Sequence, residues 1–147
     1  MRRKFAKFFP RDAPSRLFAL VNDIESYPAF IPHCQRARII SRDGGVRRVE
    51  NVFGLWPLRL SFISEAHENP PREVVVESRD GALRDFRLRW LFEPKGEGCL
   101  LSCDLDLEFS SPVLNALAPL AASAFERKAM AAFERRAAAM RPQKEKT

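Results

Sequence analysis

The sequence holds few residues that could do chemistry, and its cysteines are the first to consider. Cys99 and Cys103 lie four residues apart in a segment that alternates apolar and polar residues. In a strand this spacing puts both thiols on one face but about 13 Å apart, whereas zinc needs ligands about 2.3 Å from one ion. Cys34, His33 and His67 lie elsewhere in the sequence. We therefore expect no metal site, and we interpret the cysteines as small core residues.

A second candidate is a pair of carboxylates, Asp104 and Asp106, which a strand would place on one face. A catalytic pair needs a cleft and a shifted pKa, but this face alternates with an apolar one and should be solvated. Trp56, Arg59 and His67 are the nearest candidates for polar groups inside a cavity, and they form no recognisable dyad. The sequence has no G-x-S-x-G, Walker or H-E-x-x-H motif. We expect no catalytic machinery and no need for a metal or nucleotide cofactor.

The elements that position these residues are mostly strands. Six of them are expected in the middle of the chain, after a first strand at residues 2–9: 36–42, 46–53, 58–67, 72–79, 83–93 and 98–109. Turn-forming pairs such as Asp43-Gly44 and Asp80-Gly81 separate them. In the last two strands an apolar face alternates with a polar one. This pattern indicates an antiparallel sheet covered on one side.

Helices are expected to supply that cover. Asp12 is placed to cap an amphipathic helix that ends near Glu25. Residues 27–32 contain two prolines and should form a short helical turn or a loop. A long C-terminal helix should start after Ser110 or Ser111, with Pro119 kinking or dividing it. A long helix against a curved sheet would leave a gap between the two.

Composition favours a single α+β domain. The chain has 147 residues, twelve of them Phe, which suits a dry interior or a cavity wall. Three cysteines, an odd number, argue against a disulfide scaffold and favour a cytosolic setting. We identify no signal peptide and no segment long enough to span a membrane. We expect a folded domain over residues 1–141 and a disordered tail over 142–147.

The net charge is +6, and basic residues gather near both ends of the chain. This distribution could favour an anionic partner, either a membrane surface or RNA. An ordinary solvated surface explains the same charge. The acidic residues Glu134 and Glu145 weaken the C-terminal end as a binding site.

The segment from Leu20 to Cys34 resembles the signature of the coenzyme Q-binding START-domain family, within the polyketide cyclase/dehydrase superfamily, which includes the bacterial ribosome association toxin proteins. Asp104–Phe109 and the helical residues Met130–Arg136 resemble the family's C-terminal part. His33 stands where the family has an aromatic residue before the cysteine. The resemblance covers residues 3 to about 140. It implies a helix-grip fold, in which a curved antiparallel sheet of six to seven strands wraps a long C-terminal helix and two short helices follow strand 1. It also implies binding of ubiquinone or a similar isoprenoid lipid in support of respiration.

The predicted ligand site is an apolar cavity between the last helix and the concave face of the sheet. We expect the lining to consist of Phe30, Ile31, Phe53, Trp56, Phe62, Phe86, Leu88, Trp90, Leu105, Leu107, Leu117, Ala121, Phe125 and Met130. The apolar tip at residues 53–57 would touch a bilayer or gate the cavity, or else fold back on the core. Tyr27 could donate a hydrogen bond to a quinone carbonyl, but a buried Tyr more often finds a backbone partner.

Three functions compete on these grounds. We favour a lipid-binding protein that shields or delivers a quinone, in the cytoplasm or peripherally on the inner membrane. A ribosome-associated regulator is the first alternative, because the basic ends could meet RNA phosphates. A cyclase or hydratase is the second, and it would need polar groups that converge inside the cavity. No feature points to DNA.

Overall fold

Alternating strands build most of the molecule. The computed structural model describes residues 1–55 and 58–141. Its elements, in chain order, are β1 (Arg2–Phe9), α1 (Pro14–Asn22), the 3₁₀ turn η1 (Ile24–Ser26), α2 (Tyr27–Phe30), β2 (Cys34–Asp43), β3 (Val46–Leu55), β4 (Leu58–Asn69), β5 (Glu73–Ser78), β6 (Leu83–Lys95), β7 (Gly98–Phe109) and α3 (Pro112–Met140). The seven strands match the predicted ones closely, and the α+β helix-grip arrangement is confirmed.

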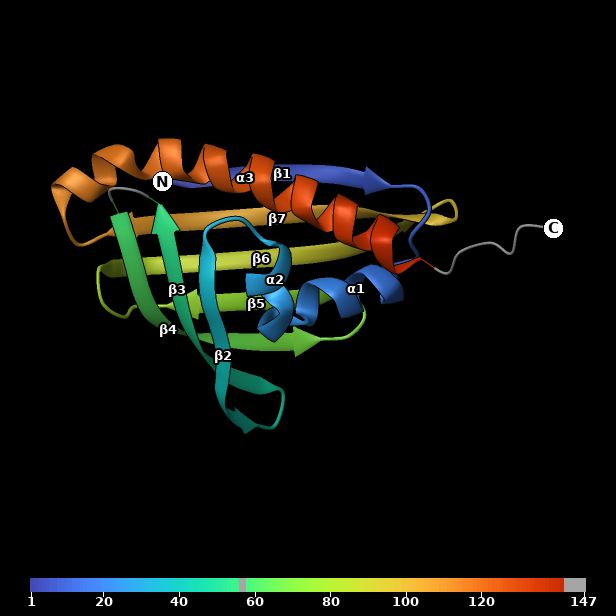
Figure 1. Cartoon of the computed structure of the whole chain (residues 1–147), viewed down its shortest axis with the longest axis horizontal. Helices are drawn as coiled ribbons and strands as arrows, with labels where there is room; N and C mark the ends of the chain where they lie inside the picture. Colours follow the sequence, from blue (N-terminus) through green and yellow to red (C-terminus); the bar gives the residue numbers. More distant parts are fainter. Residues whose placement is uncertain (56–57, 142–147) are drawn as a thin grey trace.

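The strands form one antiparallel sheet in the order β1-β7-β6-β5-β4-β3-β2. Hairpins join consecutive strands from β2 to β7. The first strand, β1, pairs with the last, β7, so that Phe5 lies opposite Cys103. Figure 1 shows β2, β3 and the first part of β4 turned steeply from the direction of β5, β6 and β7, while the second part of β4 bends to run alongside β5. Register shifts in β2, after Cys34 and after Ile39, accompany this curvature. The sheet therefore has a concave face that can enclose a helix.

The two faces of the sheet differ as the alternation predicts. Along β7, Cys99, Leu101, Cys103 and Leu105 are buried, while the residues between them are partly exposed. Asp104 and Asp106 lie on that wetter face, and Asp106 pairs with Arg2 at 2.8 Å. The concave face therefore carries the core, and the convex face carries the charges.

Helix α3 covers the concave face near β7 and β1 (Figure 1). The side chain of Ser111 caps it by accepting a hydrogen bond from the Leu114 N–H at 3.4 Å, as predicted. Alanines let the helix approach the sheet closely, and those buried are Ala118, Ala122, Ala129, Ala132 and Ala137. Pro119 does not divide the helix, which runs unbroken for 29 residues. Figure 1 shows its first turns inclined to the rest.

The start of α1 differs from the prediction. Its N-cap is Ala13, and no side chain caps it. Asp12 is instead fully buried, at 0% exposure, and accepts hydrogen bonds from Arg141 at 3.2 and 3.0 Å. Pairing with two guanidinium nitrogens stabilises the Asp12 carboxylate more than capping a helix would, because charge-assisted bidentate hydrogen bonds are strong.

The end of α1 also comes earlier than Glu25. The helix stops at Asn22, where the buried guanidinium of Arg47 donates to the Asn22 backbone and side-chain oxygens. A 3₁₀ turn and the four-residue α2 follow, so the Pro-containing segment is the predicted short helical turn.

No helix within residues 1–55 and 58–141 is long and apolar enough to cross a membrane. Residues 142–147, expected to form a disordered tail, lie outside the described residues.

Candidate ligand-binding cavity

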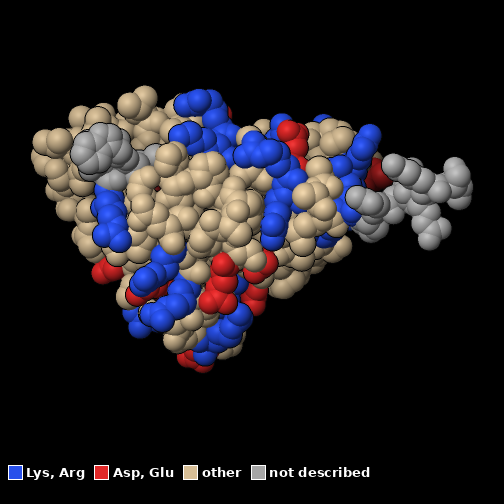
Figure 2. All heavy atoms as spheres, viewed as in Figure 1, with Lys and Arg blue, Asp and Glu red and all other residues tan. Residues whose placement is uncertain are grey.

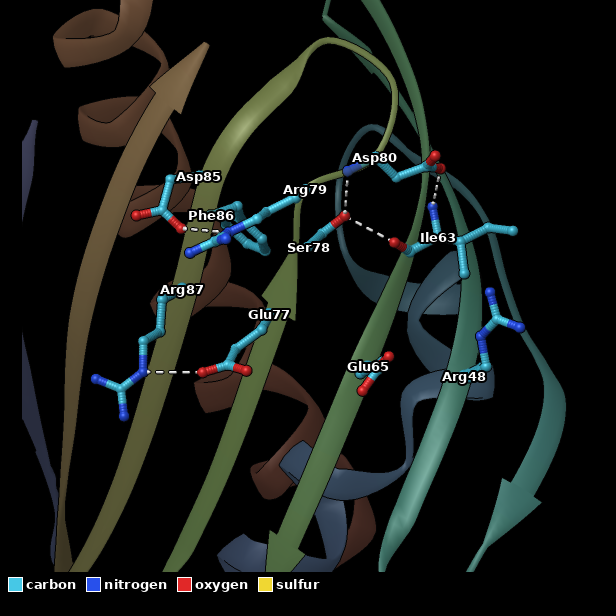
Figure 3. A pocket seen from close by; sticks show the side chains of 10 residues that line it. All are labelled: Arg48, Ile63, Glu65, Glu77, Ser78, Arg79, Asp80, Asp85, Phe86 and Arg87. Carbon is cyan, nitrogen blue, oxygen red and sulfur yellow. Dashed lines mark hydrogen bonds and ion pairs between the residues drawn. The ribbon is translucent and has the colours of Figure 1, made fainter. Parts of the chain in front are cut away.

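A hollow with a volume of about 520 Å³ lies on the convex face of the sheet, between β3 and β6. Figure 3 shows charged side chains around it, and most of them are paired with one another. Arg87 binds Glu77 at 3.2 Å, and Arg79 lies 3.7 Å from Asp85. Asp80 accepts a hydrogen bond from the Ile63 N–H at 2.8 Å.

These pairs account for the charged side chains of the groove, so no ligand is needed to neutralise them. Their side chains are largely solvent-exposed, and exposed ion pairs contribute little energy and attract little counter-charge. The surface of the groove is mostly polar, with Ile63 and Phe86 as its only apolar lining residues, and its charged side chains are open to solvent. We therefore place the candidate site on the other side of the sheet.

The interior holds two small apolar spaces under α3 and the short helices. We call the first the inner chamber; it has a volume of about 80 Å³ and is the more enclosed. Its walls are Val21, Ile24, Tyr27, Ile31, Asn51, Phe53, Phe62, Ser64, Val74, Val76, Phe86, Leu88, Trp90, Phe125 and Phe133. Helices α1, α2 and α3 and strands β3 to β6 thus meet around one space.

We call the second space the helix-side chamber, which has a volume of about 120 Å³ and an entirely apolar surface. It lies between the first half of α3 and strands β3, β4, β6 and β7. Its walls are Phe53, Leu60, Phe62, Leu83, Phe86, Leu105, Leu107, Phe109, Ala121, Ala122 and Phe125.

Four phenylalanines line both chambers and separate them: Phe53, Phe62, Phe86 and Phe125. We call them the phenylalanine septum. Phe62 packs against Phe53 with ring centroids 6.3 Å apart and against Phe86 at 5.8 Å. Because only side chains divide the two spaces, rotation of septum rings would join them into one longer cavity.

A smaller hollow of about 40 Å³ lies between α3 and the segment after α2. It shares Ile31, Phe53 and Phe125 with the inner chamber. At its rim Lys128 Nζ lies 2.7 Å from His33 Nε2. This hollow is therefore next to the inner chamber.

Most of the predicted lining residues lie in these walls. The structure places ten of them on the inner chamber, the helix-side chamber or both: Ile31, Phe53, Phe62, Phe86, Leu88, Trp90, Leu105, Leu107, Ala121 and Phe125. Their side chains were expected to meet because two strand faces and one helix stripe must pack together, and they do. Whether they contact a ligand stays a prediction.

Three predicted lining residues lie elsewhere. Phe30 faces a surface hollow on the far side of α2, where the Arg136 guanidinium lies 5.0 Å from its ring centroid. Leu117 is 39% exposed, because at this turn of α3 the neighbouring Ala118, at 1% exposure, is the residue packed into the core. Met130 is buried in the core but borders neither chamber. Trp56 lies outside the described residues.

Asn51 and Ser64 are polar residues of the inner chamber that the prediction missed. A signal for Asn51 exists in the sequence, because it lies between Val49 and Phe53 on the inward face of β3. A search for alternating apolar residues does not identify an amide side chain as part of a cavity wall.

The remaining side chains that could do chemistry are hydrogen-bonded or buried. The Tyr27 hydroxyl donates to the Val21 carbonyl oxygen, which confirms the backbone partner. Burial raises the pKa of Cys34 and of Cys99 to about 11. Across the described ranges, no cluster of three His, Cys, Asp or Glu side chains is arranged to hold a metal ion.

A curved antiparallel sheet that grips a long helix around an apolar cavity defines a START-like helix-grip domain. The chain belongs to the polyketide cyclase/dehydrase and lipid transport family, whose model matches residues 13–134. The resemblance drawn from residues 20–34 is thereby confirmed.

Similar proteins of known name fall into two groups. The chain is 28% identical to the ribosome association toxin RatA of Pseudomonas aeruginosa over 110 residues, 73% of this chain and 76% of that protein. It is 29% identical to the coenzyme Q-binding protein COQ10 homolog B, mitochondrial, of Xenopus laevis over 127 residues, 83% of this chain. The match spans about half of that COQ10 homolog, 52% of its length. Among solved structures, TTHA0849 from Thermus thermophilus superposes with a TM-score of 0.84 at 18% identity, over 97% of this chain and 100% of that one.

Proposed function

We propose that this protein binds ubiquinone or a similar isoprenoid lipid in the inner and helix-side chambers and shields or delivers it. The observation that carries the proposal is the pair of apolar chambers, with walls built from several strands and helices rather than from one loop. Burial of apolar ligand surface contributes about 25 cal/mol per Å². A relative whose name includes coenzyme Q binding supports the choice of ligand.

The size of the chambers limits how such a ligand fits. Volumes of about 80 and 120 Å³ are below the roughly 300–1,000 Å³ of ordinary ligand pockets. Neither chamber alone holds a substituted ring, since a cavity of roughly 150 Å³ is the size that binds benzene. The phenylalanine septum must therefore rotate to join the chambers, and a long isoprenoid tail must leave the cavity.

A lipid-handling protein must also approach the bilayer, and one end of the molecule suits this. Val113, Leu117 and Leu120 are exposed on the first turns of α3. Figure 2 shows this end without Lys or Arg over α3, while basic side chains gather along the rest of that face. An apolar patch beside a basic surface fits an anionic bilayer.

Lipid extraction is the first test. The protein is purified without detergent, extracted with organic solvent, and its bound lipid identified by mass spectrometry; we expect an isoprenoid quinone. A wild-type protein that carries no lipid and binds no added ubiquinone would contradict the proposal.

Ala121→Trp tests the location of the site. Ala121 lies on the wall of the helix-side chamber, so Trp would occupy ligand space and lower ubiquinone affinity at least tenfold with a small change in melting temperature. In a solid core the same change would overpack and cost about 1–3 kcal/mol. Ala116→Trp, at an exposed position of the same helix, is the control, and Ala121→Leu repeats the test with a smaller side chain. Equal affinity in all variants would place the ligand elsewhere.

A second candidate function is association with ribosomal subunits, supported by the RatA similarity and the net charge of +6. It predicts co-sedimentation with purified subunits that weakens as salt rises. Failure to co-sediment at low salt would leave lipid binding as the proposed function.

A further inference from the structure

Two polar side chains project into the otherwise apolar inner chamber. Asn51 on β3 is 8% exposed and Ser64 on β4 is 2% exposed, and both line the chamber. The Tyr27 hydroxyl, another polar group in its wall, is already bound to the Val21 carbonyl oxygen. Buried polar side chains are costly unless they are hydrogen-bonded, so the bonding of Asn51 and Ser64 decides what they offer to a ligand.

Their hydrogen bonds use the amide nitrogen of Asn51 as donor and the hydroxyl oxygen of Ser64 as acceptor. Asn51 Nδ2 donates to Ser64 Oγ at 2.9 Å and lies 3.1 Å from the Val49 carbonyl oxygen and 3.3 Å from that of Phe62. These contacts fix the amide with its nitrogen toward the strands. Among residues 1–55 and 58–141, no further side-chain hydrogen bond is formed by Asn51 Oδ1 or by the Ser64 hydroxyl. The Ser64 O–H remains free to donate, and Asn51 Oδ1 remains free to accept.

Aromatic rings surround this pair. Phe62, Phe86, Trp90, Phe125 and Phe133 line the same chamber. Aromatic walls favour a flat ring, which packs against them face to edge or in offset stacks. The chamber thus combines aromatic walls with the hydrogen-bond donor of Ser64 and the acceptor of Asn51.

The charge of the chamber narrows the ligand class. None of the described wall residues is Lys, Arg or His. A fatty-acid carboxylate would be buried there without a counter-charge, at high cost. A neutral head with carbonyl or hydroxyl oxygens has no such cost.

We infer that Asn51 and Ser64 form the polar recognition site for the ring oxygens of a neutral quinone or quinol. The Ser64 O–H donates to a quinone carbonyl oxygen, and Asn51 Oδ1 accepts from a quinol hydroxyl, so the pair serves both forms of the head. This inference rests on the proposed function, because it assumes that the ligand enters the inner chamber.

The test uses two probes of similar shape: a short-chain ubiquinone, and an alkylbenzene of matched chain length without ring oxygens. Ser64→Ala removes the donor but keeps the volume nearly constant. We expect ubiquinone affinity to fall about three- to tenfold, as for loss of one neutral hydrogen bond, and alkylbenzene affinity to stay unchanged. Ser78→Ala is the matched control: Ser78 is a buried serine of the same sheet that donates to the Ile63 carbonyl oxygen at 2.7 Å and borders the convex groove. It should change neither affinity.

The outcomes separate the two proposals. If Ser64→Ala binds ubiquinone as tightly as wild type, or loses both probes in parallel, the pair does not recognise ring oxygens and the inference is overturned. If the wild type binds neither probe, the proposed function itself fails. Ser64→Cys, nearly isosteric with a weaker donor, repeats the measurement if Ser64→Ala does not fold, and the same selective loss is expected.

Discussion

Cys34, Cys99 and Cys103 carry the most nucleophilic atoms of the chain, and the fold buries all three. Their position follows from strand alternation, because Cys99 and Cys103 share the inward face of β7 with Leu101. Desolvation disfavours the thiolate, and it raises the pKa of Cys103 as well as those of Cys34 and Cys99. Because the thiolate is the reactive form, these residues act as packing groups at neutral pH.

Thiol reactivity tests this conclusion. At pH 8 a disulfide reagent should react with the native protein far more slowly than with the unfolded chain, which should release three equivalents. Fast labelling of the native protein would show an exposed thiol and contradict the burial.

The same groups predict a dependence of stability on alkaline pH. A thiol whose pKa is about 9 when unfolded and about 11 when folded loses its proton first in the unfolded state. The free energy of unfolding should therefore be unaffected below pH 9 and should fall between pH 9 and 11. Cys34→Ala/Cys99→Ala should show a shallower fall over this range in urea titrations; an unchanged slope would mean that other groups cause it.

At the scale of elements, the buried Asp12 joins two parts of the chain that are distant in sequence. Its carboxylate follows β1, and it binds Arg16 of α1 at 3.4 Å and Arg141 at the end of α3. The pair therefore fixes the C-terminal end of α3 against α1.

Arg141→Met should lower the free energy of unfolding, because it leaves the buried Asp12 carboxylate with a weaker partner. Arg135→Met, at an exposed position of the same helix, should change it by less than about 0.5 kcal/mol. Urea unfolding of both variants checks the difference. Equal stability of the two would show that Asp12 finds sufficient compensation from Arg16 alone.

The strands and the long helix were predictable because each depends on local pattern. Alternation with turn pairs identified β5, β6 and β7 to within about two residues. The apolar period of α3 pointed to the buried Ala129 and Ala132, but not to Ala118, Ala122 and Ala137, which are also buried. Asp12 was misassigned because a cap is a local signal, whereas its partner Arg141 lies 129 residues away. The exposure of Leu117 was also not predicted, because the apolar pattern does not show which of the neighbours Leu117 and Ala118 packs into the core. The phenylalanine septum depends on side-chain contacts between distant strands, which no periodicity encodes.

At the scale of the whole molecule, charge and apolar surface are separated. The net charge is +6, and basic side chains gather over the middle and end of α3 on the face that Figure 2 shows. The exposed aliphatic residues lie on the first turns of the same helix, with Val113 71% and Leu120 72% exposed. Ala121, one turn from these residues, borders the helix-side chamber. A bilayer at this end would thus be next to the space proposed for the lipid.

This arrangement predicts weak, reversible binding to vesicles that contain anionic lipid. Each basic residue near such a surface contributes about 1 kcal/mol and is screened by salt, so binding should fall as salt is raised. Val113→Ser/Leu120→Ser should lower the partition coefficient at least tenfold, since burying one such side chain contributes about 1.5–3 kcal/mol. Both positions are exposed, so the melting temperature should stay within a few degrees of wild type.

Ile40→Ser/Met140→Ser, at exposed aliphatic positions on β2 and at the far end of α3, is the matched control and should bind vesicles as wild type does. Flotation of all three proteins at low and high salt, with parallel melts, measures both effects. Equal flotation of the two variants would show that the first turns of α3 do not enter the membrane.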